Sequence, residues 1–190
     1  MTRSRRPPQA NRRGDVIERF YDRHPYPPPT ADLDAVAAGS GGPLRGRAAH
    51  HLIWPERPLA AARRVLVAGC GTGQAARHAL LRPGDKVVGI DVSASSIGHT
   101  RRLADRHGLD NLLLHRLAVE DAGELGETFD HVVCTGVLHH LADPLAGLRS
   151  LRAVLAPGGA ITLMVYAPYG RAGVYLMQDY CRRLGVTTDR

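Results

Sequence analysis

Three glycines alternate with other residues directly after a short apolar segment, in the stretch 65–73 (VLVAGCGTG). Glycine allows a sharp turn and a close approach of a ligand to the backbone, because it has no Cβ atom. A helical segment follows, and the first turn of a helix has unpaired N–H groups that bind anions or polar ligands. We therefore predict that Gly69, Gly71 and Gly73 form a ligand-binding turn; the alternative is a tight turn without a ligand.

The spacing of these glycines indicates the class of ligand. A dinucleotide-binding fingerprint reads GxGxxG, which would place its third glycine at position 74. Position 74 is glutamine here, and the third glycine comes one residue earlier. The spacing disfavours a pyrophosphate, so a nicotinamide-dependent oxidoreductase is only an alternative.

An acidic residue ends the next apolar segment, 86–92 (KVVGIDV). This residue, Asp91, lies 20 residues after Gly71. In parallel sheets an acid at such a strand end accepts hydrogen bonds from ribose hydroxyls. A solvated carboxylate or a helix cap is the alternative. Together, the glycine turn and Asp91 predict a site for a nucleoside without a pyrophosphate.

Five segments with the character of buried strands alternate with segments of helical periodicity. The expected strands span 65–69, 86–92, 112–117, 129–136 and 160–167. The expected helices cover about ten residues after Gly73 and the stretches 94–107, 144–155 and 174–184. This alternation predicts an α/β fold with a Rossmann-like, doubly wound, mostly parallel sheet, whose ligands bind at the carboxyl ends of the strands.

The N-terminal third has a different organisation. Residues 1–14 form an arginine- and proline-rich tail that we expect to be disordered. Residues 15–60 combine short helical stretches with a proline run that must be extended, and they precede the main domain, 61–190. We expect this N-terminal prelude to act as a lid.

Charge and composition exclude several classes of protein. Five arginines precede the first acidic residue, Asp15, and account for five of the seven net positive charges, which weakens a nucleic-acid reading. The chain has no apolar run of the roughly 18 residues that a membrane span needs. Its three cysteines lack metal-ligand spacing, so we predict no metal site, no disulfide framework and a cytoplasmic location.

The motifs VLVAGCGTG, GIDVS, FDHVVCTGVLHHLADP and LAPGGAITL, within residues 64–167, resemble consecutive motifs of class I S-adenosyl-L-methionine-dependent methyltransferases. The flanking stretches YDRHPYP and YAPYGRAGVYLMQ resemble a bacterial branch of that family. The resemblance implies the strand order 3-2-1-4-5 and two further strands that we do not find. We therefore expect an open fifth-strand edge, so that the chain is a fragment, or a homo-oligomer or partner chain covers this edge.

The resemblance also implies roles for nine residues toward S-adenosyl-L-methionine, whose product is S-adenosyl-L-homocysteine. The three glycines, with Thr135 and Gly136, would line the methionine and ribose part. Asp91 would bind the ribose hydroxyls, while Val92, Val119 and Glu120 would border the adenine. The predicted cofactor contacts are thus Gly69, Gly71, Gly73, Asp91, Val92, Val119, Glu120, Thr135 and Gly136.

Two positions depart from the family pattern. Many members have an acid where this chain has Val67, and another where it has Ala118. The first departure puts in doubt how the methionine ammonium is held. The second makes Glu120 the substitute for the acid that meets the adenine amino group.

Methyl transfer from a sulfonium depends largely on orientation, and a general base is needed only when the acceptor must lose a proton. The catalytic residues are otherwise unknown, and His139 is the candidate base, ahead of His140. Tyr21 and Tyr26 are candidates for an aromatic lid, and Arg171 is a candidate contact for an anionic acceptor.

The sequence therefore predicts a methyltransferase that acts on an unidentified acceptor. We expect a small molecule or a protein as acceptor rather than a nucleic acid, and no membrane. A non-catalytic cofactor-binding or regulatory module is one alternative, favoured by Val67 and the missing strands. The oxidoreductase is the other, and modification of RNA or DNA through the arginine-rich tail is a third, less favoured hypothesis.

Overall fold

The computed structural model describes residues 19–25, 28–38, 46–56, 58 and 62–186. The predicted N-terminal tail and Tyr26 lie outside these residues. Within them, no helix combines the length and the hydropathy needed to cross a membrane.

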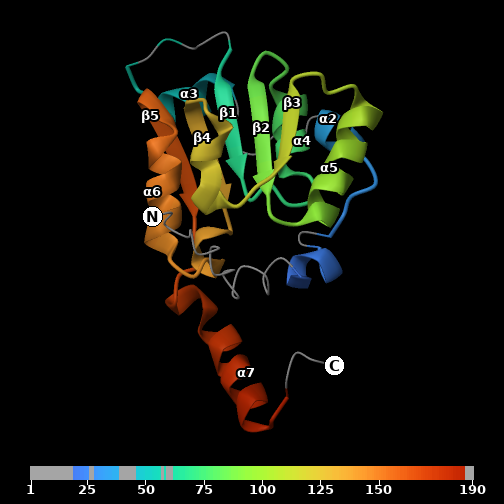
Figure 1. Ribbon diagram of the computed structural model, residues 1–190, viewed down its shortest axis with the longest axis vertical. Coiled ribbons are helices and arrows are strands. Elements are labelled where there is room, and N and C mark those ends of the chain that lie inside the picture. The colour runs from blue at the N-terminus through green and yellow to red at the C-terminus, as the bar shows by residue number, and fades with distance from the viewer. Residues whose placement is uncertain (1–18, 26–27, 39–45, 57, 59–61, 187–190) are drawn as a thin grey trace, which may run out of the picture.

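Five parallel strands form one sheet in the order β3-β2-β1-β4-β5 (Figure 1). The strands are β1 (Arg64–Ala68), β2 (Lys86–Asp91), β3 (Leu112–Arg116), β4 (Phe129–Thr135) and β5 (Leu155–Met164). This arrangement confirms the predicted α/β, Rossmann-like fold and its strand order. The first strand is central because its apolar residues are buried on both faces, as expected of a parallel sheet.

Helices cover both faces of the sheet (Figure 1). Val65 and Val67 pack with the helix that follows β1, whereas Leu66 and Ala68 pack toward the opposite face, because side chains alternate along a strand. The helices are α2 (Asp34–Ala37), α3 (Gly46–Ile53), α4 (Gln74–Leu81), α5 (Ala94–His107), α6 (Pro144–Ala153) and α7 (Ala172–Arg183). The short 3-10 helices are η1 (Val119–Leu125), η2 (Leu138–His140) and η3 (Tyr169–Arg171).

Local sequence signals set the helix ends that border the carboxyl edge of the sheet. The hydroxyl of Ser93 accepts the N–H of Ser96 and caps α5, which ends at Gly108 in the left-handed conformation (φ 58°). The carboxylate of Asp143 caps α6, which has a proline at its first position. These caps place the beginning of each helix directly after the end of a strand or its loop.

The boundary between α6 and β5 corrects one prediction. The predicted helix spans 144–155 and the predicted strand begins at 160, but the helix ends at Ala153 and Leu155 begins β5, which includes the Pro-Gly-Gly at 157–159. Leu155 pairs with Phe129, and a register irregularity follows before the regular pairing resumes. A strand at the edge of the described sheet tolerates proline and glycine at such an irregularity. The Pro-Gly-Gly segment therefore lies inside β5 and does not separate the helix from the strand.

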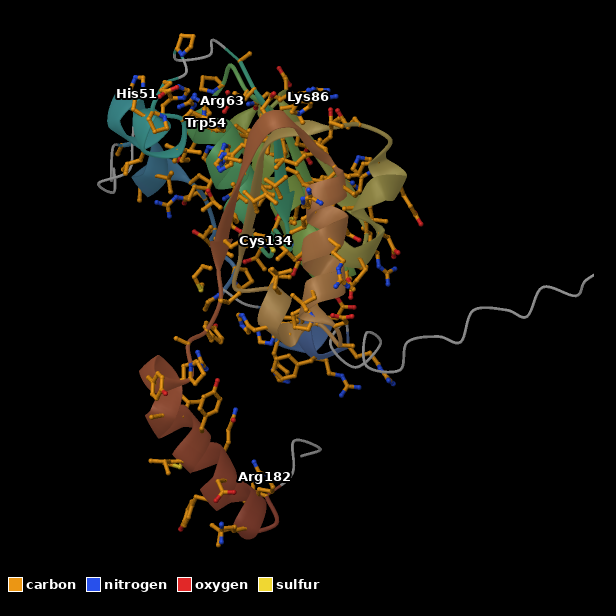
Figure 2. All side chains as sticks on the ribbon, turned by 90° about the vertical axis from the view of Figure 1, so that its left-hand side faces the viewer. His51, Trp54, Arg63, Lys86, Cys134 and Arg182 are labelled. Atoms are coloured by element: carbon orange, nitrogen blue, oxygen red, sulfur yellow. The ribbon has the colours of Figure 1, made fainter. Side chains whose placement is uncertain are left out.

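The N-terminal segments pack on the sheet, whereas α7 does not. Residues 19–23 are helical, and Trp54 after α3 lies against Arg63 at the amino end of the strands (Figure 2). The indole N–H of Trp54 donates to the carbonyl of Gly158 in β5, over 3.2 Å. In contrast, α7 extends away from the sheet in both views and has no buried residue (Figures 1 and 2).

Gly89 in β2 permits close packing between the sheet and α4. A Cβ atom at this position would lie 2.8 Å from the Cβ of Ala75 and 2.8 Å from Cδ2 of Leu114. We therefore expect Gly89→Ala to lower the free energy of unfolding by about 1–3 kcal/mol, because neither the backbone of α4 nor that of β3 can move away easily. Denaturant titration measures this, with Gly98→Ala in α5 as the control, since that position has room for a Cβ. Equal midpoints for the Gly89→Ala variant and the wild type would contradict the packing argument.

His131 predicts how stability depends on pH. The ring is buried beside Trp54 and its Nε2 lies 2.8 Å from Oγ1 of Thr162. Burial, and then the neighbouring His78 and Arg63, lower the pKa of His131 from 6.5 to about 4. The unfolded chain therefore binds a proton below pH 6.5 that the folded chain refuses until about pH 4.

We expect this difference to remove up to about 3 kcal/mol of stability as the pH falls through that window. His131→Gln should flatten the loss, because glutamine does not titrate. The control is His115→Gln, at an exposed position of β3. Unfolding free energies at pH 7, 5.5 and 4 test this, and an unchanged pH slope in His131→Gln would refute it.

Candidate functional site

A cavity of about 950 Å³ lies at the carboxyl ends of the strands. Its volume is within the range of small-molecule and cofactor sites. Its lining includes all nine residues predicted as cofactor contacts, namely Gly69, Gly71, Gly73, Asp91, Val92, Val119, Glu120, Thr135 and Gly136. The fold therefore brings together residues that are up to 67 positions apart in the sequence.

The glycine turn has two positions that require glycine. Gly69 (φ 66°) and Gly71 (φ 54°) adopt the left-handed conformation, and a Cβ at Gly69 would also lie 2.3 Å from Cγ2 of Val137. The carbonyl of Gly71 accepts the hydroxyl of Thr100 over 2.9 Å, which ties the turn to α5. Gly73 differs, because its backbone is extended (φ 179°) and a Cβ would meet only ordinary contacts. Conformation therefore explains glycine at 69 and 71 but not at 73.

Asp91 is bonded directly to the glycine turn. Its Oδ2 accepts the N–H of Gly71 over 2.8 Å, and its Oδ1 accepts the N–H of Ser93 over 2.9 Å. Burial raises the pKa of Asp91, although the two backbone N–H groups act in the opposite direction. Each carboxylate oxygen has a second lone pair, so the group can still accept ligand hydroxyls. The cap of α5 is Ser93 and not Asp91.

The side chain of Gln74 has a role that the glycine spacing did not indicate. Its Nε2 donates to Oγ1 of Thr135 over 2.5 Å, which joins the start of α4 to the end of β4. Gly136, next to Thr135, is in the left-handed conformation (φ 76°). Gln74, which replaces the third glycine of a dinucleotide fingerprint, therefore lines the cavity and connects α4 to β4 there.

The N-terminal prelude contributes directly to the site. The hydroxyl of Ser93 donates to Oδ1 of Asp22 over 2.6 Å, and the N–H of Ser95 reaches the same oxygen over 3.2 Å. The Ser93 hydroxyl lowers the pKa of Asp22. The adjacent Tyr21 lines the cavity and lies edge-on to His140, with 6.0 Å between ring centroids. Tyr21 is one of the predicted lid residues, whereas Asp22 was not predicted, because no local pattern marks it.

Two histidines follow β4 with different environments. His140 lines the cavity, whereas His139 is not among its lining residues. The His139 ring lies 3.9 Å from the ring of Tyr166, and both its nitrogens are buried without a hydrogen-bond partner among the described residues. Burial lowers the pKa of both histidines, and the positive charge of Arg171 lowers both further. The order of preference, His139 before His140, therefore has no support in the geometry, and a catalytic role remains a prediction for either.

One of the two departures from the family pattern lies in the core of the sheet. Val67 is fully buried in β1, so the position offers no carboxylate to the cavity. The acidic residues that line the cavity within the described part of the chain are Asp32, Asp91 and Glu120. In the same residues, no group of three or more His, Cys, Asp or Glu side chains is arranged to hold a metal ion.

Comparisons with known proteins show the family of this chain. The family model described as "Methyltransferase domain" matches residues 66–161, about half of the chain. An uncharacterised protein of Synechococcus sp. is 34% identical over 86% of this chain and 40% of its own length. The tRNA 5-carboxymethoxyuridine methyltransferase of Escherichia coli K12 is 33% identical over 68% of this chain and 52% of its own length. The chain thus spans about half, or less, of the length of these relatives.

The fold is similar to that of a solved protein as well. The structure of PKMT2 from Rickettsia typhi in complex with AdoHcy matches 82% of this chain and 30% of its own length, with a TM-score of 0.60 and 23% identity. At this identity, the likeness shows the fold alone. Together with the family match, it places the chain among the class I S-adenosylmethionine-dependent methyltransferases, to which it belongs.

The contact between Asp91 and the glycine turn leads to a prediction about affinity. We expect Asp91→Ala to weaken binding of S-adenosylhomocysteine by about 1.5–3 kcal/mol, roughly 10- to 150-fold, because charge-assisted hydrogen bonds are lost. Isothermal titration calorimetry measures the affinity. Asp110→Ala, at an exposed position after α5, is the control. Wild-type affinity in a folded Asp91→Ala variant would exclude Asp91 as the ribose contact.

Proposed function

We propose that this chain binds S-adenosylmethionine in the cavity at the carboxyl edge of the sheet and transfers its methyl group to an acceptor. The observation that carries the proposal is the convergence on one cavity of the nine residues that the glycine pattern, Asp91 and the family resemblance predicted. These residues come from the turn after β1, the end of β2, η1 and the end of β4. These segments are separated in the sequence, and the fold brings them to one cavity.

The residues present fit an adenosine better than a dinucleotide. Asp91 is held by two backbone N–H groups and has lone pairs left for two ribose hydroxyls. Val92 and Val119 offer apolar contacts to a base, and Glu120 offers a carboxylate beside them. Gln74 begins α4, at the position where a dinucleotide-binding fold has a glycine beside the pyrophosphate. Its side chain instead donates a hydrogen bond to Thr135 at the end of β4.

When bound, the cofactor supplies a methyl group made electrophilic by its sulfonium. The task of the protein is to orient the reactants and to exclude water. In our proposal, the glycine turn and Thr135 fix the amino-acid side of the cofactor, and the helical segment with Tyr21 and Asp22 covers the site. His140 lines the cavity as a neutral imidazole, because burial lowers its pKa, so it can accept a proton from an acceptor hydroxyl.

We propose a small molecule or a protein side chain as the acceptor. This preference rests on the distribution of charge along the sequence, since five of the seven net positive charges precede Asp15. A nucleic acid is the second candidate, because the Escherichia coli relative is named as a tRNA methyltransferase. We also propose a cytoplasmic location, which agrees with the free, buried thiols of Cys70 and Cys134.

A transfer assay tests the proposed function. The protein is incubated with methyl-labelled S-adenosylmethionine and with a cell extract separated into small molecules, proteins and RNA. We expect label in the small-molecule or protein fraction, reduced at least roughly tenfold by Asp91→Ala at subsaturating cofactor and unchanged by Asp110→Ala.

Each competing reading has its own outcome. Label in the RNA fraction would establish the second candidate. Tight binding of S-adenosylhomocysteine without transfer to any fraction would support a non-catalytic module. Preferential binding of NAD over S-adenosylhomocysteine would overturn the proposal in favour of an oxidoreductase.

A further inference from the structure

An arginine from the segment after β5 lines the same cavity as Asp91. Arg171 ends η3, just after β5, and is partly buried. Its guanidinium carbon lies 3.8 Å from the ring centroid of Tyr166, which itself stacks on His139 with 3.9 Å between centroids. A cation–π contact of this kind holds the guanidinium in place and leaves its N–H groups available. The side chain is therefore positioned by aromatic rings and not by an acid.

Arg171 has no anionic partner within the described part of the chain. No carboxylate there lies within 4.0 Å of its guanidinium, and its side chain makes no hydrogen bond among the same residues. Nearby arginines behave differently, since Arg182 and Arg183 in α7 both bond to Asp179 over 2.7 Å. A partly buried cation beside a cavity, with no acid to pair with, is a site for an anion from outside the chain.

Asp91, Glu120 and Arg171 reach the cavity from segments that follow different strands. Asp91 ends β2 and Glu120 follows β3, while Arg171 follows β5 on the other side of the sheet order. Two strands, β1 and β4, separate β2 from β5, so the axes of β2 and β5 are roughly 14 Å apart. At that separation of the strands, across a solvent-accessible cavity, Asp91 neutralises little of the charge on Arg171.

The residues that line the cavity also differ in their relation to the family. All nine predicted cofactor contacts lie inside the stretch 66–161 that the family model matches. Tyr21, Tyr166 and Arg171 line the same cavity from outside that stretch. The part of the cavity around Arg171 is therefore built by segments outside the matched domain, where contacts to an acceptor are expected.

We infer that Arg171 binds an anionic group of the methyl acceptor, a carboxylate or a phosphate, and so selects an anionic acceptor. The inference rests on the proposed function for the reaction that this acceptor undergoes. The planar guanidinium presents paired N–H donors that match both kinds of anion. His140 lies on the same side of the cavity and would face the acceptor held there.

Calorimetry with three small probes tests the inference. The protein is saturated with S-adenosylhomocysteine and titrated with benzoate, phenyl phosphate and benzamide, which share a ring and differ in charge. We expect at least one anion to bind at least roughly tenfold tighter than the neutral benzamide, as charge-assisted hydrogen bonds require. The tighter anion distinguishes a carboxylate acceptor from a phosphate acceptor.

Matched variants assign the preference to one residue. Arg171→Met keeps an unbranched chain against Tyr166 and should abolish the preference, whereas Arg171→Lys should keep part of it. Arg149→Met removes one charge from an exposed position of α6 and should leave the preference intact. If Arg171→Met does not fold, Arg171→Gln replaces it in the comparison.

Three results would overturn the inference. They are equal or undetectable binding of all three probes, an unchanged preference in Arg171→Met, or a preference that depends on Arg77 instead, the exposed arginine that also lines the cavity. The affinity for S-adenosylhomocysteine is measured first and separately. Absence of that binding in the wild type refutes the proposed function, and the anion preference is then judged without cofactor, so the two failures are distinguishable.

Discussion

The carboxylate of Asp91 connects the parts of this site. It accepts the N–H of Gly71 from the turn after β1 and the N–H of Ser93 from the start of α5. Ser93 in turn caps its own helix and donates to Asp22 in the N-terminal prelude. One partly buried charge therefore joins two strand ends, a helix and a covering segment. Because these donors are fixed by the fold, the acid is oriented before any ligand arrives.

The cavity is lined partly by the stretch that the family model matches and partly by segments outside that stretch. The part near Asp91 is built by the stretch that the family shares, and its turn needs glycine for conformational reasons. The part near Arg171 is built by segments before and after that stretch, with stacked rings in place of backbone turns. In our proposal, the part inside the family domain holds the cofactor and the part around Arg171 holds the acceptor.

Sequence patterns predicted most of the fold because the signals are local. The caps at Ser93 and Asp143 and the glycine at 108 mark helix ends through hydrogen bonds within a few residues. The predicted start of β5 was wrong because the true start depends on pairing with Phe129, 26 residues earlier. The strand also accommodates the Pro-Gly-Gly segment at a register irregularity. Periodicity along one segment carries no information about its partner strand.

The sequence by itself determined where the glycine turn and Asp91 lie in the fold, since both are recognisable from their spacing after buried strands. Only the tertiary structure decided which groups from distant segments join them. It placed Asp22 at the start of α5, His140 rather than His139 at the cavity, and Arg171 beside Tyr166 without an acid. These contacts depend on how a helix or loop docks on the sheet, which is set by packing over the whole domain and leaves no trace in the local order of residues.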